Sequence, residues 1–162
     1  STKTVQRYLE YLRLSYQVIV LPAWERNALK RLVKAPKVHF IDNGVLQAVL
    51  QQRGGLTGNE FESLVIAEIY KQAKNMFVNV SFHHLRTQDG KEIDLLVEVQ
   101  DGYYAFEIKM AEHVQPFDAR HLLDVEHILD KPLLHGFVLS NDNETHYFSD
   151  KVTALHVAMF LG

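Results

Sequence analysis

Residues 91–110 read KEIDLLVEVQDGYYAFEIKM, and this stretch predicts two β-strands joined by a two-residue turn. Asp101 and Gly102 form a dipeptide that strongly favours a hairpin, because a type I′ turn needs positive φ at both central residues. Alternating apolar side chains mark one face of each strand: Ile93, Leu95, Val97 and Val99 on the first, and Tyr104, Phe106, Ile108 and Met110 on the second. We expect this hairpin to be the centre of a sheet.

Three charged side chains share the other face of this predicted hairpin. A two-residue loop sets Lys109 opposite Asp94, and it places Glu107 on a diagonal from Asp94 with about 7–8 Å between backbones. Two carboxylates of that reach can close on one Mg²⁺ or Mn²⁺ ion, while the lysine stabilises developing charge in phosphodiester cleavage. The alternative is a solvated cross-strand ion pair between Asp94 and Lys109.

Length and composition fit one well-buried core, or one domain with a smaller appendage, in 162 residues. The absence of cysteine excludes disulfides and thiolate metal sites. No apolar run reaches 18 residues and no signal peptide is visible, so we expect a cytoplasmic protein without a membrane partner. Because the chain begins at Ser1 in a helical pattern, we expect it to be a fragment of a longer protein.

Charge divides unevenly along the chain. Residues 1–50 hold eight Lys/Arg against three acids, a net +5, and the remainder holds nine against 17, a net −8. Residues 24–37 form a basic arm with Trp24 as a candidate for stacking on a base. The arm is either a phosphate-contacting or partner-contacting element or a solvated basic loop or helix. The candidates for nucleic-acid contact within it are Arg26, Lys30, Arg31 and Lys34.

Element signals predict an α/β or α+β fold in which helices flank a mixed sheet. The glycine-rich stretch at residues 53–58 separates a basic linker or partial winged-helix-like segment, residues 1–53, from a domain at 58–162. We expect Asn59 to cap a helix that runs to about residue 74. Glu62 falls inside the apolar arc of that helix, which makes it a functional candidate unless the helix is partly exposed there.

Other motifs exclude some site types. His83 and His84 are adjacent on a predicted strand and point to opposite faces, so they cannot chelate one ion together. His113, His121 and His127 have no i, i+4 pair, and we expect structural or solvated histidines. The chain also contains no GxxxxGK[ST] motif, which excludes nucleotide binding by a P-loop in this fragment.

Several stretches together resemble one family, the uncharacterised C-terminal region of bacterial and archaeal AAA-type ATP-binding proteins. In that family a P-loop ATPase module and a winged-helix segment lie upstream, so the resemblance implies an ATPase partner in the same chain. The matching stretches are 4–8 (TVQRY), 26–34 (RNALKRLVK), 36–44 (PKVHFIDNG), 58–68 (GNEFESLVIAE), Arg86-Thr87 and 90–94 (GKEID).

The second half also resembles the restriction-endonuclease-like PD-(D/E)XK fold. The resemblance implies metal ligands at Glu62, Asp94 and Glu107, a further ligand from the Ile108 carbonyl, and Lys109 beside the nucleophilic water. Ile93 stands where a proline often precedes the aspartate, a variation that the pattern tolerates. Arg86, from the family match, is a further candidate for nucleic-acid contact.

Two functions remain open on the sequence alone. In the first, the domain is a Mg²⁺- or Mn²⁺-dependent DNA nuclease, which the complete four-residue set favours. In the second, it is a catalytically inactive nuclease-fold module that binds DNA or a partner protein and is coupled to the upstream ATPase. The acidic charge of the second half favours the second function. A homo-oligomer is an additional expectation.

Overall fold

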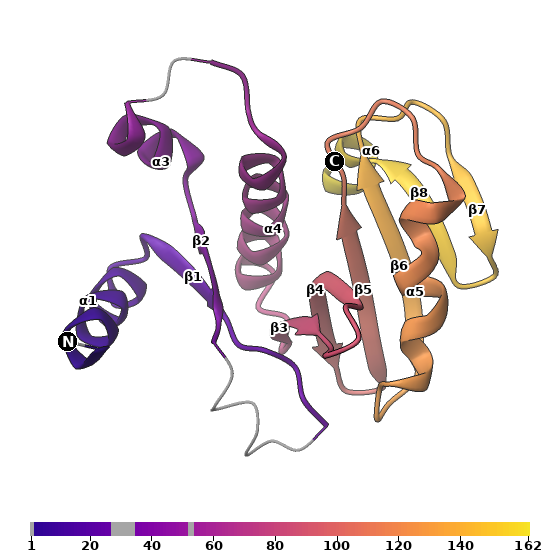
Figure 1. The fold of residues 1–162 in the computed structure, drawn as a ribbon, viewed down its shortest axis with the longest axis horizontal. Helices are drawn as coiled ribbons and strands as arrows, with labels where there is room; N and C mark the ends of the chain where they lie inside the picture. The colour runs from indigo at the N-terminus through magenta and orange to yellow at the C-terminus, as the bar shows by residue number, and fades with distance from the viewer. Residues whose placement is uncertain (1, 27–34, 52–53) are drawn as a thin grey trace.

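A six-stranded mixed sheet forms the centre of the protein in a computed structural model that describes residues 2–26, 35–51 and 54–162 (Figure 1). Strand order is β3-β4-β5-β6-β8-β7, with parallel pairs β5–β6 and β6–β8 and antiparallel pairs elsewhere. The predicted mixed sheet is confirmed, although a strand beginning at Val152 had no sequence signal. The strands are β3 (Ser81–Arg86), β4 (Glu92–Val99), β5 (Gly102–Ile108), β6 (Leu133–Ser140), β7 (His146–Ser149) and β8 (Val152–His156).

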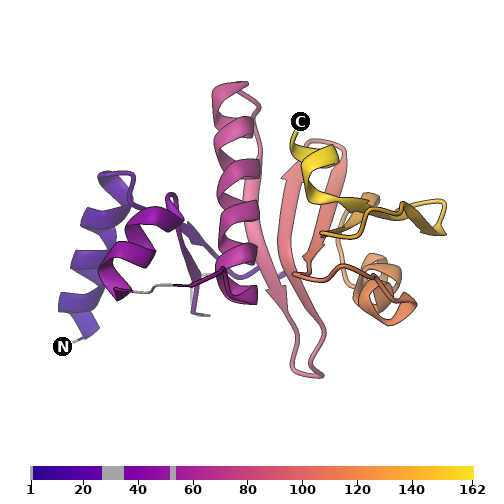
Figure 2. The same cartoon turned by 90° about the horizontal axis from the view of Figure 1, so that it is seen from above.

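Helices cover both faces of this sheet (Figure 2). One face packs against α4 (Gly58–Asn75) and α6 (Val157–Leu161), and the other against the 3-10 turn η1 (Pro116–Ala119), α5 (Arg120–Asp124) and η2 (Val125–His127). The sequence predicts one helix over residues 116–129, but the structure divides this stretch into three short helical turns. Within the described residues, every helix is too short or too polar to cross a membrane.

The N-terminal segment packs beside α4, on the side away from α5 (Figures 1 and 2). It comprises α1 (Thr2–Leu14), β1 (Val18–Leu21), β2 (Lys37–Phe40) and α3 (Asn43–Leu50), with β1 and β2 in an antiparallel pair. Ile19 and Leu21 of β1 join the hydrophobic core beneath α4. The segment therefore shares a core with the sheet; its predicted winged-helix character stays a prediction.

Trp24, which follows β1, is hydrogen-bonded to two strands of the large sheet. Its backbone N–H donates to the His84 carbonyl at 2.6 Å, and its indole N–H donates to the Tyr103 hydroxyl at 3.1 Å. The two rings meet edge to face with centroids 6.1 Å apart, and Trp24 is 5% exposed. A buried ring cannot stack on a base, so the sequence-based assignment of Trp24 to nucleic-acid contact is wrong.

The central hairpin forms, but in a different register from the predicted one. Val99 pairs with Gly102, so the two loop residues are Gln100 and Asp101, and neither has positive φ. Gly102 is needed for another reason: a Cβ there would lie 2.4 Å from the Pro132 carbonyl oxygen. Close approach of the chain that enters β6 explains this glycine, and the type I′ prediction is wrong.

This register shifts the pairing by two residues, which keeps every side chain on its predicted face of β5. Leu95 pairs with Phe106, so Asp94 and Glu107 are the next positions along the two strands. Lys109 therefore lies beyond the β4 ladder, not opposite Asp94, and its N–H donates to the Leu139 carbonyl of β6 at 2.9 Å.

A β-bulge interrupts β4 at Asp94. His83 pairs with Leu96 and Leu85 pairs with Ile93, so two residues of β4 oppose one of β3. As a result, Ile93 packs in the α5-side core, while Leu95 packs in the α4-side core. Strict alternation from 93 to 99 is therefore wrong at its first residue.

Candidate functional site

Helix α4 brings Glu62 to the edge of the sheet. The helix begins with a capping box in which Thr57, not the predicted Asn59, is the N-cap: the Glu60 N–H donates to Thr57 Oγ1 at 3.3 Å and the Thr57 N–H to Glu60 Oε2 at 2.7 Å. The apolar residues that follow bury one side of the helix against the sheet. Glu62 emerges one turn after the cap, with its side chain 19% exposed.

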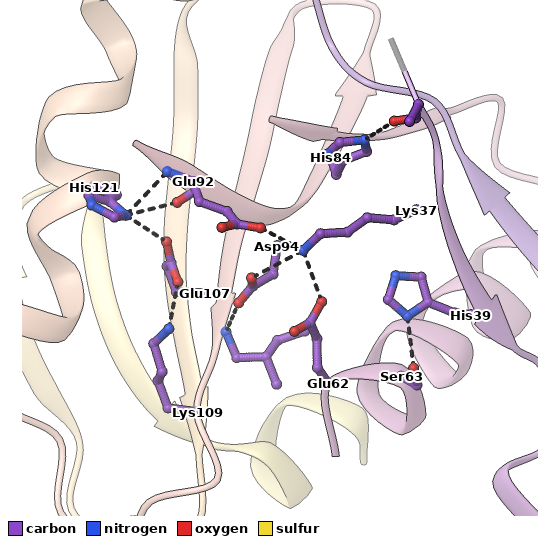
Figure 3. Close-up of polar contacts among 12 residues, drawn as sticks. Lys37, His39, Glu62, Ser63, His84, Glu92, Asp94, Glu107, Lys109 and His121 are labelled. Carbon is purple, nitrogen blue, oxygen red and sulfur yellow. Dashed lines mark hydrogen bonds and ion pairs between the residues drawn. The ribbon is translucent and has the colours of Figure 1, made fainter. Parts of the chain in front are cut away.

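Asp94 lies at the β4 bulge and is nearly buried, at 6% exposure. Its Oδ2 accepts a hydrogen bond from the Ile108 N–H at 2.9 Å, across the space between β4 and β5. Burial raises the pKa of Asp94, the neighbouring Glu62 charge raises it further, and the hydrogen bond from Ile108 offsets part of the effect. Asp94 lies between Glu62 and Glu107, and these three carboxyl groups with Lys109 are called the acidic group below (Figure 3).

Glu107, near the end of β5, is 3% exposed. Lys109 Nζ lies 3.0 Å from Glu107 Oε2, and His121 Nδ1 of α5 lies 3.5 Å from Oε1. Oε1 is buried and accepts no hydrogen bond. Burial raises the pKa of Glu107 to about 8, with the Asp94 charge as the next cause, and Lys109 offsets only part of this rise. Burial of Glu107 therefore favours the protonated form of its carboxyl group.

Lys109 is the cation on this side of the group, and its side chain is 37% exposed. Burial acts to lower its pKa, but the charges of Glu107 and Asp94 act against burial and leave the pKa raised. The ammonium group therefore stays charged at neutral pH, 3.0 Å from the Glu107 carboxyl group. Lys109 is thus a charged hydrogen-bond donor beside the buried carboxyl groups of Asp94 and Glu107.

Lys37 of β2 supplies a second cation from the N-terminal segment. Its Nζ lies 2.9 Å from Glu92 Oε1, 3.2 Å from Glu62 Oε1 and 3.8 Å from Asp94 Oδ1 (Figure 3). Burial acts to lower the pKa of Lys37, but the hydrogen bond to Glu92 and the charges of Glu62 and Asp94 leave it raised. The acids of the sheet region are thus neutralised in part from another segment.

The four residues proposed for catalysis, Glu62, Asp94, Glu107 and Lys109, lie in one group in the structure. Ile108 adjoins the group, and its N–H is bound to Asp94. Arg26 lies elsewhere: its guanidinium donates to the carbonyls of Ile128 and Leu129 at 3.3 and 3.2 Å. Arg86 lies at the end of β3, paired in register with Glu92. Lys30, Arg31 and Lys34 fall outside the described residues.

Sequence reasoning missed three neighbours of this group: Lys37, Glu92 and His121. His121 Nδ1 lies 2.9 Å from the Glu92 carbonyl oxygen, which fixes the ring beside Glu107. Its nearest partners are 14 and 29 positions away in the chain, so no local spacing marks it. In the sequence Lys37 is only one of several basic residues, because its carboxylate partners are also far away in the chain.

A metal ion would find two buried carboxylates in this group, Asp94 and Glu107, while the third, Glu62, is paired with Lys37 at 3.2 Å. Among the described residues, no set of three or more His, Asp or Glu side chains is arranged to hold a metal ion. Mg²⁺ needs only one or two protein carboxylates, because waters and substrate oxygens complete its octahedron. Asp94 and Glu107 fit that requirement: both have raised pKa values, which a nearby cation would relieve, and Glu107 Oε1 has no hydrogen-bond donor.

Two known protein families match most of the chain. Residues 57–160 match a domain of unknown function, DUF4143, and residues 1–55 match a second domain of unknown function, DUF8612. The chain belongs to the DUF4143 family. The division between the two matches falls in the glycine-rich stretch that the sequence marked as a boundary.

Two relatives, both described as uncharacterized proteins, match part of the chain. These two proteins, from Mycobacterium bovis and Mycobacterium tuberculosis, are each 31% identical in an alignment of 113 residues that covers 65% of this chain. The chain spans about a quarter of their length, because the match covers 25% of each relative. A solved assembly of Thermococcus gammatolerans McrB AAA+ hexamers with bound McrC is similar with a TM-score of 0.43 and 11% identity, over 62% of this chain and 27% of that one.

Proposed function

We propose that the group around Asp94 is the active site of a nuclease that hydrolyses DNA phosphodiester bonds with Mg²⁺ or Mn²⁺. The observation that carries this proposal is the pair of buried carboxylates, Asp94 and Glu107, with the Lys109 ammonium 3.0 Å from Glu107. Burying two acids side by side costs free energy, and groups perturbed in this way cluster at functional sites. The combination also supports a nuclease-like core of the PD-(D/E)XK type.

Each residue of the group has a role in this proposal. Asp94 and Glu107 would hold the ion, with Glu62 and the Ile108 carbonyl as further ligands. The ion would lower the pKa of a bound water and polarise the phosphate. Lys109 would orient that water and stabilise the charge that develops on the phosphate oxygens as the water oxygen bonds to phosphorus and the ester P–O bond breaks. The attacking water would release a proton to solvent, and the departing ester oxygen would take up a proton from solvent.

A second candidate function has an observation in its favour. Lys37 already neutralises part of the acidic group, and the chain beyond residue 50 carries a net charge of −8. Both features suit a module that binds DNA or a partner protein without cutting, and that works with an upstream ATPase. The sequence resemblance described above supports such an ATPase in the longer protein, where assembly into oligomers is an additional proposal.

Cleavage assays with Lys109→Met distinguish these functions. The apolar stem of lysine is retained in methionine while the charge is lost, so the fold is expected to persist. We expect the variant to lose cleavage of duplex or single-stranded DNA by about 100-fold or more in Mn²⁺ or Mg²⁺. Lys131→Met is the matched control, because Lys131 pairs with Glu98 at 2.9 Å outside the group.

Two results would count against a nuclease. Cleavage that persists in Lys109→Met would place the active site elsewhere. Wild-type protein, with its ATPase module present, that cuts neither form of DNA in either metal would favour the binding module.

A further inference from the structure

The Lys37 ammonium group occupies the Glu62 side of the acidic group. It is within 4 Å of three carboxylates, and two of them, Glu62 and Asp94, are proposed above as metal ligands. In Figure 3, Nζ lies between these two side chains. A single positive charge therefore already bridges oxygens that a divalent cation would need.

The position of Lys37 is fixed by the surrounding structure. Its backbone pairs with Leu21 of β1, and Leu21 is fully buried in the α4-side core. Two residues further along β2, His39 Nδ1 lies 2.8 Å from Ser63 Oγ, next to Glu62 on α4. Strand β2 is thus held against the same helix that carries Glu62, and the Lys37 side chain is only 27% exposed.

We propose that Lys37 competes with the metal ion for Glu62 and Asp94, so that the N-terminal segment controls how tightly the site binds its metal. This inference rests on the proposed function and adds a mode of regulation to it. A cation bound at Asp94 repels the ammonium group, and Glu62 can turn to the metal only when it leaves Lys37. Any partner or substrate phosphate that draws Lys37 away therefore strengthens metal binding.

Thermodynamic linkage makes this competition reciprocal. If Lys37 weakens metal binding by a given factor, then the bound metal weakens the contact of Lys37 with Glu62 by the same factor. Metal binding should consequently loosen β2 against α4 while it tightens the carboxylates of β4 and β5. Both changes can be measured without any assay of cleavage.

Titration with Mn²⁺ tests the first change, with electron paramagnetic resonance of free Mn²⁺ as the readout. We expect the full chain carrying Lys37→Met to bind Mn²⁺ at least about fivefold more tightly than wild type, the lower range of coupling between sites. Lys131→Met removes a lysine of comparable exposure from a carboxylate outside the group and should leave the affinity unchanged.

The outcomes separate this inference from the proposed function. Equal or weaker binding by Lys37→Met, with measurable binding by wild type, would overturn the competition and leave the nuclease proposal standing. No binding by wild type or either variant at millimolar Mn²⁺ would overturn both proposals. Tighter binding by both lysine variants would show a general charge effect, and would also overturn the competition.

Hydrogen exchange of the wild-type chain gives a second test that does not depend on the folding of a variant. With saturating Mn²⁺, amides of residues 37–40 should exchange faster than without the metal, because β2 loses the Lys37 contacts. Amides of 102–108 should exchange at the same rate or more slowly. Unchanged exchange in 37–40 when the metal is bound would overturn the proposal.

Discussion

In the sheet region, residues 57–161, two helical layers cover the strands, and the longer strands are buried on both faces. In the N-terminal segment, burial changes abruptly between neighbouring elements. Helix α1 has no buried residue, and Val5, Tyr8 and Leu12 of its apolar stripe are 41–67% exposed. Strand β1, four residues later, buries three of its four side chains. The buried core of the sheet region therefore extends across the family boundary to include β1, and it contains no residue of α1.

Truncation of one leucine in each element gives the largest expected effect. Leu21→Ala removes a fully buried side chain from the α4-side core and should lower the free energy of unfolding by about 2–5 kcal/mol. Leu12→Ala, the control on α1, should change it by less than about 0.5 kcal/mol. Urea titration followed by fluorescence of Trp24, the single tryptophan, measures both. Similar costs for the two variants would remove the distinction between β1 and α1.

Glu107→Gln tests whether ionisation of the buried Glu107 carboxyl group destabilises the sheet region. A carboxyl whose pKa is raised on folding stabilises the fold fully below its unfolded pKa, and loses that contribution as pH rises through its folded pKa, here about 8. Glutamine mimics the protonated form and does not ionise. We expect the variant to match wild type near pH 5 and to be more stable by up to about 5 kcal/mol near pH 9, since the Glu107 pKa rises from 4.5 to about 8 on folding and one pKa unit corresponds to about 1.4 kcal/mol.

Thermal unfolding of both proteins from pH 5 to 9 measures this difference. Glu112→Gln, a change of the same kind at an exposed residue, should follow the wild-type curve. Parallel curves for wild type and Glu107→Gln would show that Glu107 ionises without cost, and that the carboxylate pair is not strained by burial.

Thr57→Ala tests the junction between the two regions, with the smallest expected effect. Loss of the capping box at the start of α4 should cost about 1 kcal/mol of stability, because the Glu60 N–H loses its acceptor. Asn59→Ala, at the cap expected from the sequence, should cost less than about 0.5 kcal/mol. Chemical denaturation compares the two variants, and a larger loss in Asn59→Ala would restore Asn59 as the cap.

Periodicity predicted the parts of this structure that depend on nearby residues. The alternation of β5 and the apolar arc of α4 both follow from side chains within a few turns or strand steps, whereas Glu62, expected inside that arc, is only partly buried.

Contacts between distant segments account for the errors. Gly102 resembles a turn residue in the sequence, but the approach of Pro132 determines its position, so the predicted register was off by two. Lys37 reaches carboxylates 25 to 57 positions away, and nothing in its own neighbourhood indicates them. A site built across such separations can be recognised only after the strands are placed.

Ala23 and His84 form an isolated parallel β-bridge beside the contact that Trp24 makes with His84. This bridge also affects whether the protein can aggregate through its sheet edges. An open sheet offers unpaired N–H and C=O groups along its outermost strands, which can recruit another chain. At the β3 edge some of these groups are already paired within the protein: the Trp24 N–H donates to the His84 carbonyl, and the His84 N–H donates to the Pro22 carbonyl. At the opposite margin β7 is four residues long, and its pairing with β8 is irregular. One margin is shielded and the other is short, so aggregation through strand addition has little template at either end.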